Sequence, residues 1–101
     1  MLHLLNYSVM NRESWQLLDA MLSTDDHLIL YEQAVMMLVP NHPSISELLQ
    51  WADRGIKLYV LQEDCSKNNL DLDQRCKTVF NLVDYAGFVG LVADNPKVQS
   101  L

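Results

Sequence analysis

Residues 78–93 read Thr-Val-Phe-Asn-Leu-Val-Asp-Tyr-Ala-Gly-Phe-Val-Gly-Leu-Val-Ala, and they decide how the rest of the chain is interpreted. The first part, Val79 to Val83, is apolar and rich in residues that favour a buried strand. Asp84 then interrupts the strand and is a good helix N-cap, because a carboxylate accepts hydrogen bonds from the free N–H groups of a first helical turn. We therefore predict a buried strand that runs directly into a helix.

The predicted helix carries two kinds of apolar residue. Large side chains recur at helical spacing: Tyr85, Phe88, Val89 and Val92. Small residues at positions i, i+4 and i+7 form a second face where another backbone could approach closely: Ala86, Gly90 and Ala93. We interpret residues 78–93 as a packing hub of the core, and the small face as a candidate surface for docking a partner.

Strands and helices alternate along the whole chain. Apolar runs predict strands over residues 2–7, 27–31, 56–61, 79–83 and 97–101. Helical spacing predicts helices over residues 12–22, 34–38, 45–54, 65–68 and 85–93. The alternation indicates an α/β fold, with a three-layer α/β/α arrangement and a mainly parallel sheet of four to five strands. The length of 101 residues corresponds to a single domain over 1–101.

Polar residues predict where several helices begin and end. Ser44 and Glu47 have the spacing of a capping box, with Ser44 as the N-cap. Asp64 is expected to cap the short helix that follows the third strand. Gly55 and Asn69 are expected to take the left-handed conformation that ends a helix.

The acidic composition argues against several functional classes. The formal net charge is −6, so nucleic-acid phosphates would repel the free chain. No apolar run is long enough to span a membrane, and the opening residues lack the basic residues of a signal peptide. The two cysteines then favour a reducing compartment, and none of the three glycines forms a phosphate-binding fingerprint. We expect a cytoplasmic protein that binds no cofactor and contacts neither nucleic acid nor membrane directly.

Cys65 is the first candidate for a reactive residue. It lies near a predicted helix N-terminus, where a thiolate is stabilised by the helix dipole, but the two acidic residues before it would raise its pKa. Cys76 lies between Arg75 and Lys77, which favour a thiolate. However, Cys76 precedes a predicted strand and so lies away from the strand carboxyl ends, where ligands bind in parallel sheets. Neither cysteine has the flanking residues of a zinc site.

The histidines share no spacing that would predict a metal site or a catalytic triad. His3 and His27 fall on predicted strands, and His42 lies between two prolines. From the residues alone, no metal, catalytic or cofactor site is predicted. What remains is a small acidic domain that binds other proteins.

Several segments carry a resemblance to a known family. The most specific is Val-Asp-Tyr-Ala-Gly-Phe-Val at 83–89, followed by Leu91-Val92 and by Lys-Val-Gln-Ser at 97–100. Weaker matches lie at residues 1–4, 27–35 and 59–64, and the match is weakest over 36–54. Together these segments resemble the DsrH/TusB family, whose members are small subunits of bacterial sulfur-relay complexes. Gln33-Ala34 and Asn69 stand where that family usually has Asp-Gly and Gly.

The resemblance implies a DsrE/DsrF/DsrH-like fold and a non-catalytic subunit of a TusBCD-like complex. Such a complex passes persulfide sulfur toward 2-thiolation of the tRNA wobble uridine, and the expected partners are TusC/DsrF-like and TusD/DsrE-like subunits. The DsrE/TusD-type relatives carry a persulfide cysteine at about the end of the third strand. The matching position here is Leu61, which cannot carry sulfur. We therefore expect the partner to carry the sulfur and the candidate interface to contain Ala86, Gly90, Ala93 and Val98.

Three alternatives stay open from the sequence. The chain is either a TusB-like subunit or a DsrH-like subunit of a DsrEFH-type complex in sulfur oxidation. A second alternative is that Cys65 itself carries the persulfide, which would make the subunit part of the catalytic machinery of a sulfurtransferase. A third is a self-assembling domain, in which the isolated chain forms a homo-oligomer that has no link to sulfur or tRNA.

Overall fold

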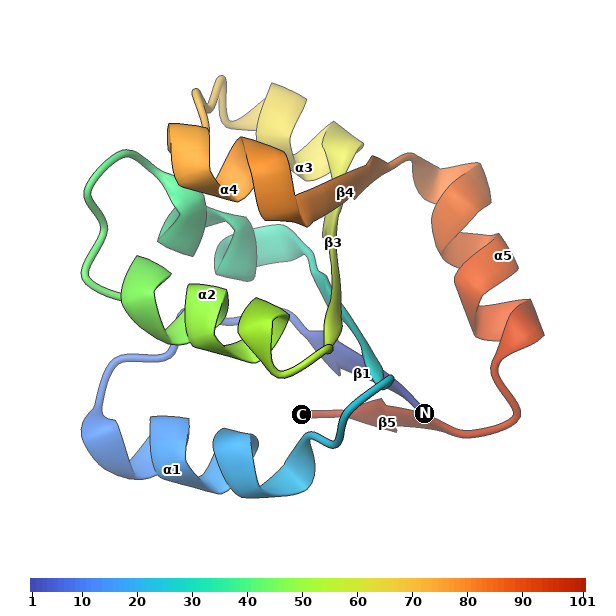
Figure 1. Cartoon of the computed structure of the whole chain (residues 1–101). Helices are drawn as coiled ribbons and strands as arrows, with labels where there is room; N and C mark the ends of the chain where they lie inside the picture. The colour runs from blue at the N-terminus through green and yellow to red at the C-terminus, as the bar shows by residue number, and fades with distance from the viewer.

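The computed structural model describes residues 1–101 and contains one five-stranded sheet, in which every paired strand is parallel to its neighbour (Figure 1). The strand order is β4-β3-β2-β1-β5. The strands are β1 (Leu2–Leu5), β2 (His27–Leu30), β3 (Lys57–Leu61), β4 (Phe80–Val83) and β5 (Val98–Ser100). The helices are α1 (Arg12–Met21), the 3-10 helix η1 (Glu32–Leu38), α2 (Ile45–Asp53), α3 (Gln62–Lys67), α4 (Gln74–Val79) and α5 (Tyr85–Asp94). The predicted α/β fold with a parallel sheet is confirmed.

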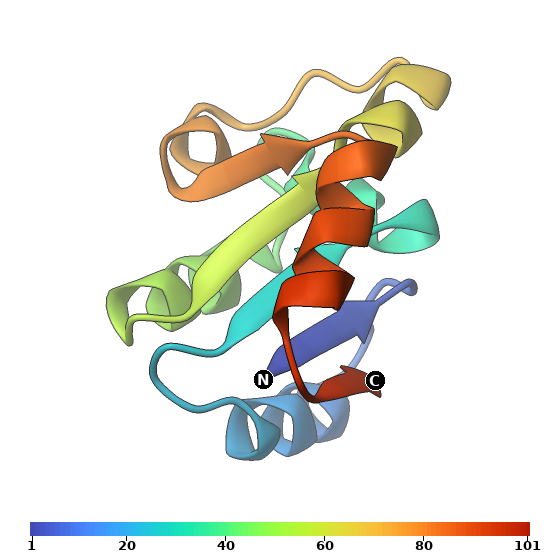
Figure 2. The same cartoon turned by 90° about the vertical axis from the view of Figure 1, so that its right-hand side faces the viewer.

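Helices lie on both faces of the sheet, but very unequally. Five helices, α1, η1, α2, α3 and α4, contribute buried residues to the main hydrophobic core on one face. Only α5 lies on the other face, and Figures 1 and 2 show it crossing the strands alone. This asymmetry leaves the outer side of α5 without any neighbour from the chain itself.

The main core forms where the apolar strand residues meet the helices. Leu28 and Leu58 are registered side by side in the sheet and are at most 1% exposed. Trp51 of α2 is 2% exposed and packs over this face. Because side chains alternate along a strand, Ile29 belongs to the opposite face, where it is also fully buried.

Gly55 and Asn69 take the predicted left-handed conformation, with φ of 87° and 52°. Gly55 ends α2 in a Schellman motif, because its N–H donates to the Ala52 carbonyl and the Ile56 N–H donates to the Trp51 carbonyl (3.0 and 3.1 Å). Glycine is required at this position, because a side chain would strain the backbone there.

The predicted capping box at Ser44 and Glu47 is wrong. Ser44 already has helical backbone angles (φ −76°, ψ −13°) and makes no side-chain cap hydrogen bond. The turn starts earlier, since the Ile45 N–H donates to the His42 carbonyl (3.1 Å). The His42 imidazole takes over the capping role, because its Nδ1 accepts a hydrogen bond from the Ser44 N–H at 3.1 Å.

The prediction that Asp64 caps α3 is also wrong. This helix begins at Gln62, so Asp64 lies within its first turn and is only 7% exposed. Its carboxylate instead accepts a hydrogen bond from the Glu32 N–H, at the point where β2 ends. Glu32 has a φ of 50°, which is uncommon for a residue other than glycine, and this hydrogen bond holds the turn in place.

Residues 78–93 do not form the predicted packing hub. The first of them belong to α4, and β4 is an edge strand in which Asn81 and Leu82 are exposed. No residue of α5 is buried. The sequence has the apolar character of a core segment, but the fold leaves most of that apolar surface open.

Candidate functional site

Helix α5 is held at its first turn by two carboxylates. The Asp84 side chain caps the helix as predicted, because Oδ1 accepts a hydrogen bond from the Gly87 N–H at 2.8 Å. Glu63, at the start of α3, accepts a hydrogen bond from the Tyr85 N–H at 3.1 Å. At the other end, the Asn95 side chain donates to the Leu91 carbonyl (2.8 Å). These contacts fix the position of a helix that is otherwise lightly packed.

The inner side of α5 touches the sheet mainly through Phe88. Its ring meets Tyr31 edge to face, with the ring centroids 5.4 Å apart. Phe88 and Leu91 are half-buried. Two half-buried side chains are a small anchor for a helix of ten residues.

The outer side of α5 is a continuous apolar surface, which we call the α5 outer face. Its members are Tyr85, Ala86, Val89, Gly90, Val92 and Ala93. Tyr85 is 58% exposed, Val89 68% and Val92 38%. From the sequence we predicted two faces of this helix, one with large residues and one with small residues. In the structure, residues of both kinds lie on this one surface.

Gly90 is the smallest point on the α5 outer face. A Cβ atom built on Gly90 would meet no atom within 4 Å. By contrast, a Cβ on Gly87 would lie 3.2 Å from the Cβ of Val83. Packing within the isolated chain therefore does not require glycine at position 90, whereas a side chain at Gly87, one turn earlier, would be crowded by Val83.

Val98, the fourth interface candidate, lies on β5. This strand forms the sheet edge beside β1, and Val98 is 41% exposed. The sheet edge at β5 and the α5 outer face are connected by only a few residues. Of the four candidate interface residues, Ala86, Ala93 and Val98 are exposed and Gly90 is half-buried.

The charges around the α5 outer face are mostly acidic. Asp84 and Asp94 stand at the two ends of the helix, and Glu63 lies beside its first turn. Lys97 follows the helix toward β5. No helix of the chain, α5 included, has the length and apolar character needed to cross a bilayer.

Cys65 lies in α3, four residues after Leu61, at the carboxyl end of β3. It is 8% exposed and lines a shallow groove with Lys77 and Leu82. Burial, followed by the nearby Asp64 carboxylate, raises the pKa of the Cys65 thiol. A buried thiol with a raised pKa is a weak nucleophile at neutral pH, because the thiolate is the reactive form.

Cys76 is fully buried in α4, so the prediction that its basic neighbours favour a thiolate is wrong. Burial and the Asp73 carboxylate raise the pKa of Cys76 to about 11, although Arg75 opposes the shift. Arg75 has little effect because its guanidinium is bound to the Asp73 carboxylate at 3.1 Å. The same bonds hold the pKa of Asp73 well below its usual range.

Each histidine is held by a structural contact. The His3 Nε2 lies 2.8 Å from the Asp26 carboxylate, and the His27 ring stacks on Tyr59. Burial raises the pKa of Asp26, but hydrogen bonds from His3, the Ser23 N–H and the N-terminal ammonium group outweigh it, so the pKa is lower than usual. Nowhere does the chain bring together three side chains of the kinds that ligate metals.

Sequence reasoning missed one feature of the site. It gave no indication that α5 would stand alone on its face of the sheet, because exposure depends on where the other helices pack. One property of the sequence does indicate this exposure, although we did not interpret it that way: the first nine residues of α5 contain no charged side chain. An exposed helix that is apolar all round is typical of a surface covered by a partner.

Comparison with known protein families matches residues 7–98 to the family described as DsrH like protein. The match covers nearly the whole chain, including the α5 outer face and the first residue of β5. A search of curated proteins finds no significant match.

Proposed function

The chain belongs to the DsrH-like family, and on this premise we propose that it is a non-catalytic subunit of a TusBCD-like sulfur-relay complex. Family members act in complexes with DsrE-like and DsrF-like partners. In the proposed role, the complex passes persulfide sulfur toward 2-thiolation of the tRNA wobble uridine. This subunit would organise the complex, while a partner carries the sulfur.

The observation that carries the proposal is the α5 outer face. Helices that are apolar on all sides are usually covered on every side, because exposed apolar surface is unfavourable in water. Here the outer side carries Tyr85, Val89 and Val92, all exposed. We infer that a TusC/DsrF-like or TusD/DsrE-like subunit covers it in the assembled complex.

The chemistry of the α5 outer face defines its partner. Small residues at Ala86, Gly90 and Ala93 allow a backbone or a flat apolar surface to approach closely. The acidic groups at both ends of the helix favour a partner patch that is apolar in the centre and basic at its rim. Val98 on β5 extends the contact toward the sheet edge.

The environment of Cys65 supports a non-catalytic role. A persulfide carrier needs an accessible sulfur with thiolate character, and Cys65 has neither. Leu61 stands at the strand end where the DsrE/TusD type carries its cysteine.

Deletion of the gene tests the proposal at the level of the pathway. We expect the deletion strain to lose 2-thiouridine from its tRNA, measured by mass spectrometry of digested nucleosides. The Cys65→Ser variant should restore the modification, because sulfur does not pass through this residue. Normal 2-thiouridine together with impaired oxidation of sulfur compounds would overturn the tRNA assignment and indicate a DsrEFH-type complex. Persulfide on Cys65, with transfer lost in Cys65→Ser, would overturn the non-catalytic role.

A further inference from the structure

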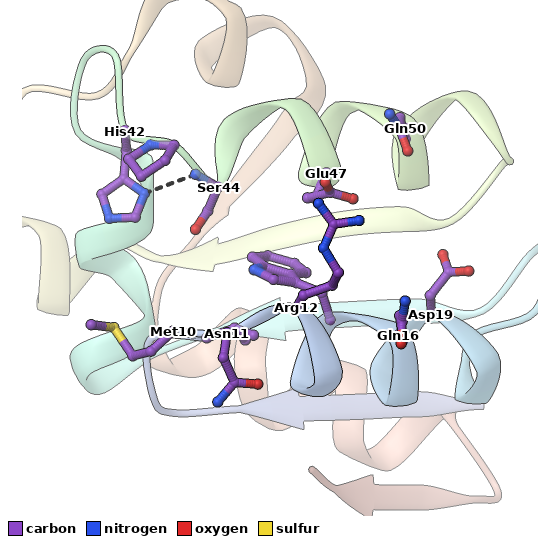
Figure 3. A pocket seen from close by; sticks show the side chains of 12 residues that line it. Met10, Asn11, Arg12, Gln16, Asp19, His42, Ser44, Glu47 and Gln50 are labelled. Carbon is purple, nitrogen blue, oxygen red and sulfur yellow. Dashed lines mark hydrogen bonds between the residues drawn. The ribbon is translucent and has the colours of Figure 1, made fainter.

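A groove of about 510 Å³ lies between α1 and α2, and contacts within the chain use its polar groups (Figure 3). The Asp19 carboxylate binds Trp51 and Arg54. The dashed line in Figure 3 marks the hydrogen bond from the Ser44 N–H to the His42 imidazole. No buried side-chain polar atom of this groove lacks a partner. Hydrogen-bonding groups without a partner lie instead at the edge of the sheet that β4 forms.

Strand β4 is the last strand on its side of the sheet, and its outer edge is open. It pairs only with β3, and residues 81–83 make no backbone hydrogen bond outside that ladder. An edge strand presents a row of unpaired N–H and C=O groups on its outer side. An extended segment of another chain can therefore hydrogen-bond to β4.

The β4 edge lacks the features that usually prevent edge strands from pairing. Residues Phe80–Val83 include no charged side chain and no proline, and their register with β3 runs without a bulge. The other edge of the sheet is better protected, because β5 is one residue shorter and directly follows Pro96 and Lys97. The two edges of the sheet thus differ in their capacity to pair with another chain.

An exposed apolar side chain lies on the same strand. Side chains alternate along a strand, so Leu82 is on the core face of the sheet together with Phe80. Phe80 is 8% exposed, whereas Leu82 is 54% exposed. Beside Leu82 lies a groove of about 450 Å³, which Leu70 and Leu72 also line. A strand that paired with β4 would cover apolar surface that the isolated chain leaves open.

We propose that β4 pairs antiparallel with β4 of a second copy of this chain, around a two-fold axis at Asn81. The pairing joins the two five-stranded sheets into one. In a two-fold antiparallel pair, one residue lies opposite its own copy. With Asn81 in that place, Phe80 of each copy lies opposite Leu82 of the other, so the exposed leucine gains an apolar cross-strand neighbour. An axis at Leu82 would instead place Phe80 opposite Asp84.

The charges at the two ends of β4 are complementary in this arrangement. Lys77 precedes the strand and Asp84 follows it, so antiparallel pairing brings Lys77 of each copy toward Asp84 of the other. One oxygen of Asp84 accepts the hydrogen bond from Gly87, and the other makes none within the chain. The present partner of Lys77 is Asp71, whose side chain is 84% exposed and holds it weakly. The pairing does not depend on the proposed role in sulfur relay.

Disulfide cross-linking of Asn81→Cys tests the position of the axis. Residues directly opposite each other in an antiparallel pair have Cα atoms about 4.5–5.5 Å apart, which a disulfide can bridge. We expect oxidation with copper phenanthroline to give a covalent dimer of this variant in non-reducing electrophoresis. The original chain should stay uncross-linked, because both of its cysteines are buried.

Leu82→Cys is the matched control for the cross-link. Its two copies are diagonal neighbours about 7–8 Å apart, which is too far for a disulfide. We therefore expect no covalent dimer of Leu82→Cys under the same oxidation. A dimer that forms as readily from Leu82→Cys, or no dimer from Asn81→Cys, would overturn the proposed pairing.

Sedimentation velocity measures the association without a cross-link. We expect the apparent mass of the original chain to rise from one chain to two with increasing concentration. Leu82→Lys should raise the dimer Kd at least about tenfold, because a charge on an edge strand opposes pairing. Val89→Lys places the same charge on the α5 outer face and should leave this Kd unchanged.

Two results of sedimentation velocity would refute the pairing. One is an original chain that stays monomeric at every concentration. The other is a dimer that Val89→Lys disrupts and Leu82→Lys does not, which would place the contact on the α5 outer face. Circular dichroism checks that each variant is folded.

Discussion

Gly90→Gln should stabilise the isolated chain and disrupt its complex. Glycine within a helix costs about 0.5–1 kcal/mol relative to a good helix former, and no atom lies within 4 Å of the new Cβ. We expect the isolated variant to gain about 0.5 kcal/mol, which raises Tm by roughly 2–4 °C. In the complex, the added side chain forces a closely packed interface apart and leaves an amide to be satisfied. We expect a loss of about 3 kcal/mol, or roughly 100-fold in Kd.

The two effects are measured separately. Differential scanning fluorimetry of the purified chain gives Tm, and titration calorimetry with co-expressed DsrE-like and DsrF-like subunits gives Kd. Ala20→Gln is the matched control, because Ala20 is an exposed small residue of α1 on the opposite side of the sheet. A fall in Tm for Gly90→Gln would mean that Gly90 packs inside the fold. An unchanged Kd would place the partner interface away from the α5 outer face.

Two substitutions and one labelling experiment test other parts of the structure. Asp84→Ala removes the α5 N-cap and should cost about 1 kcal/mol in urea unfolding; an unchanged midpoint would show that the cap is dispensable. The folded-state pKa of Asp26 is lower than usual, so its bond to His3 stabilises the fold above about pH 4 and is lost as pH falls through the folded pKa. Asp26→Asn should therefore flatten the decline of Tm in acid, whereas an unchanged pH profile would contradict this linkage. Native Cys65 and Cys76 should react with iodoacetamide far more slowly than in urea at pH 8, and rapid native labelling of Cys65 would contradict its raised pKa.

The fold was largely predictable because local signals and the alternation of elements agreed. The strand over 56–61, the ending of α2 at Gly55 and the cap at Asp84 depend on residues close in sequence, and these predictions were correct. The predictions that failed involve contacts across the fold. Asp64 bonds to Glu32, which lies on a different element, so the local spacing gave no sign of this contact.

Predictions about the candidate site were limited for the same reason, because they also depend on contacts across the fold. Apolar periodicity marks α5 as a helix that must be covered, but it does not say what covers it. Whether Val89 faces a core or a partner depends on how many helices pack on that side of the sheet. The raised pKa of Cys76 was missed because Arg75, its neighbour in sequence, binds Asp73 in the fold.

The pairing of β5 with β1 has a consequence for the order of folding. It joins the two ends of the chain, so it closes the longest loop in the fold and has the greatest entropic barrier. Strands β1 to β4 can assemble on a nascent chain before residues 98–100 emerge. Until α5 and β5 arrive, the sheet face with Ile29 and Leu61 is bare, and the immature chain is prone to aggregate through it. A partner that holds α5 would also slow the reopening of this face, adding kinetic protection that equilibrium stability does not report.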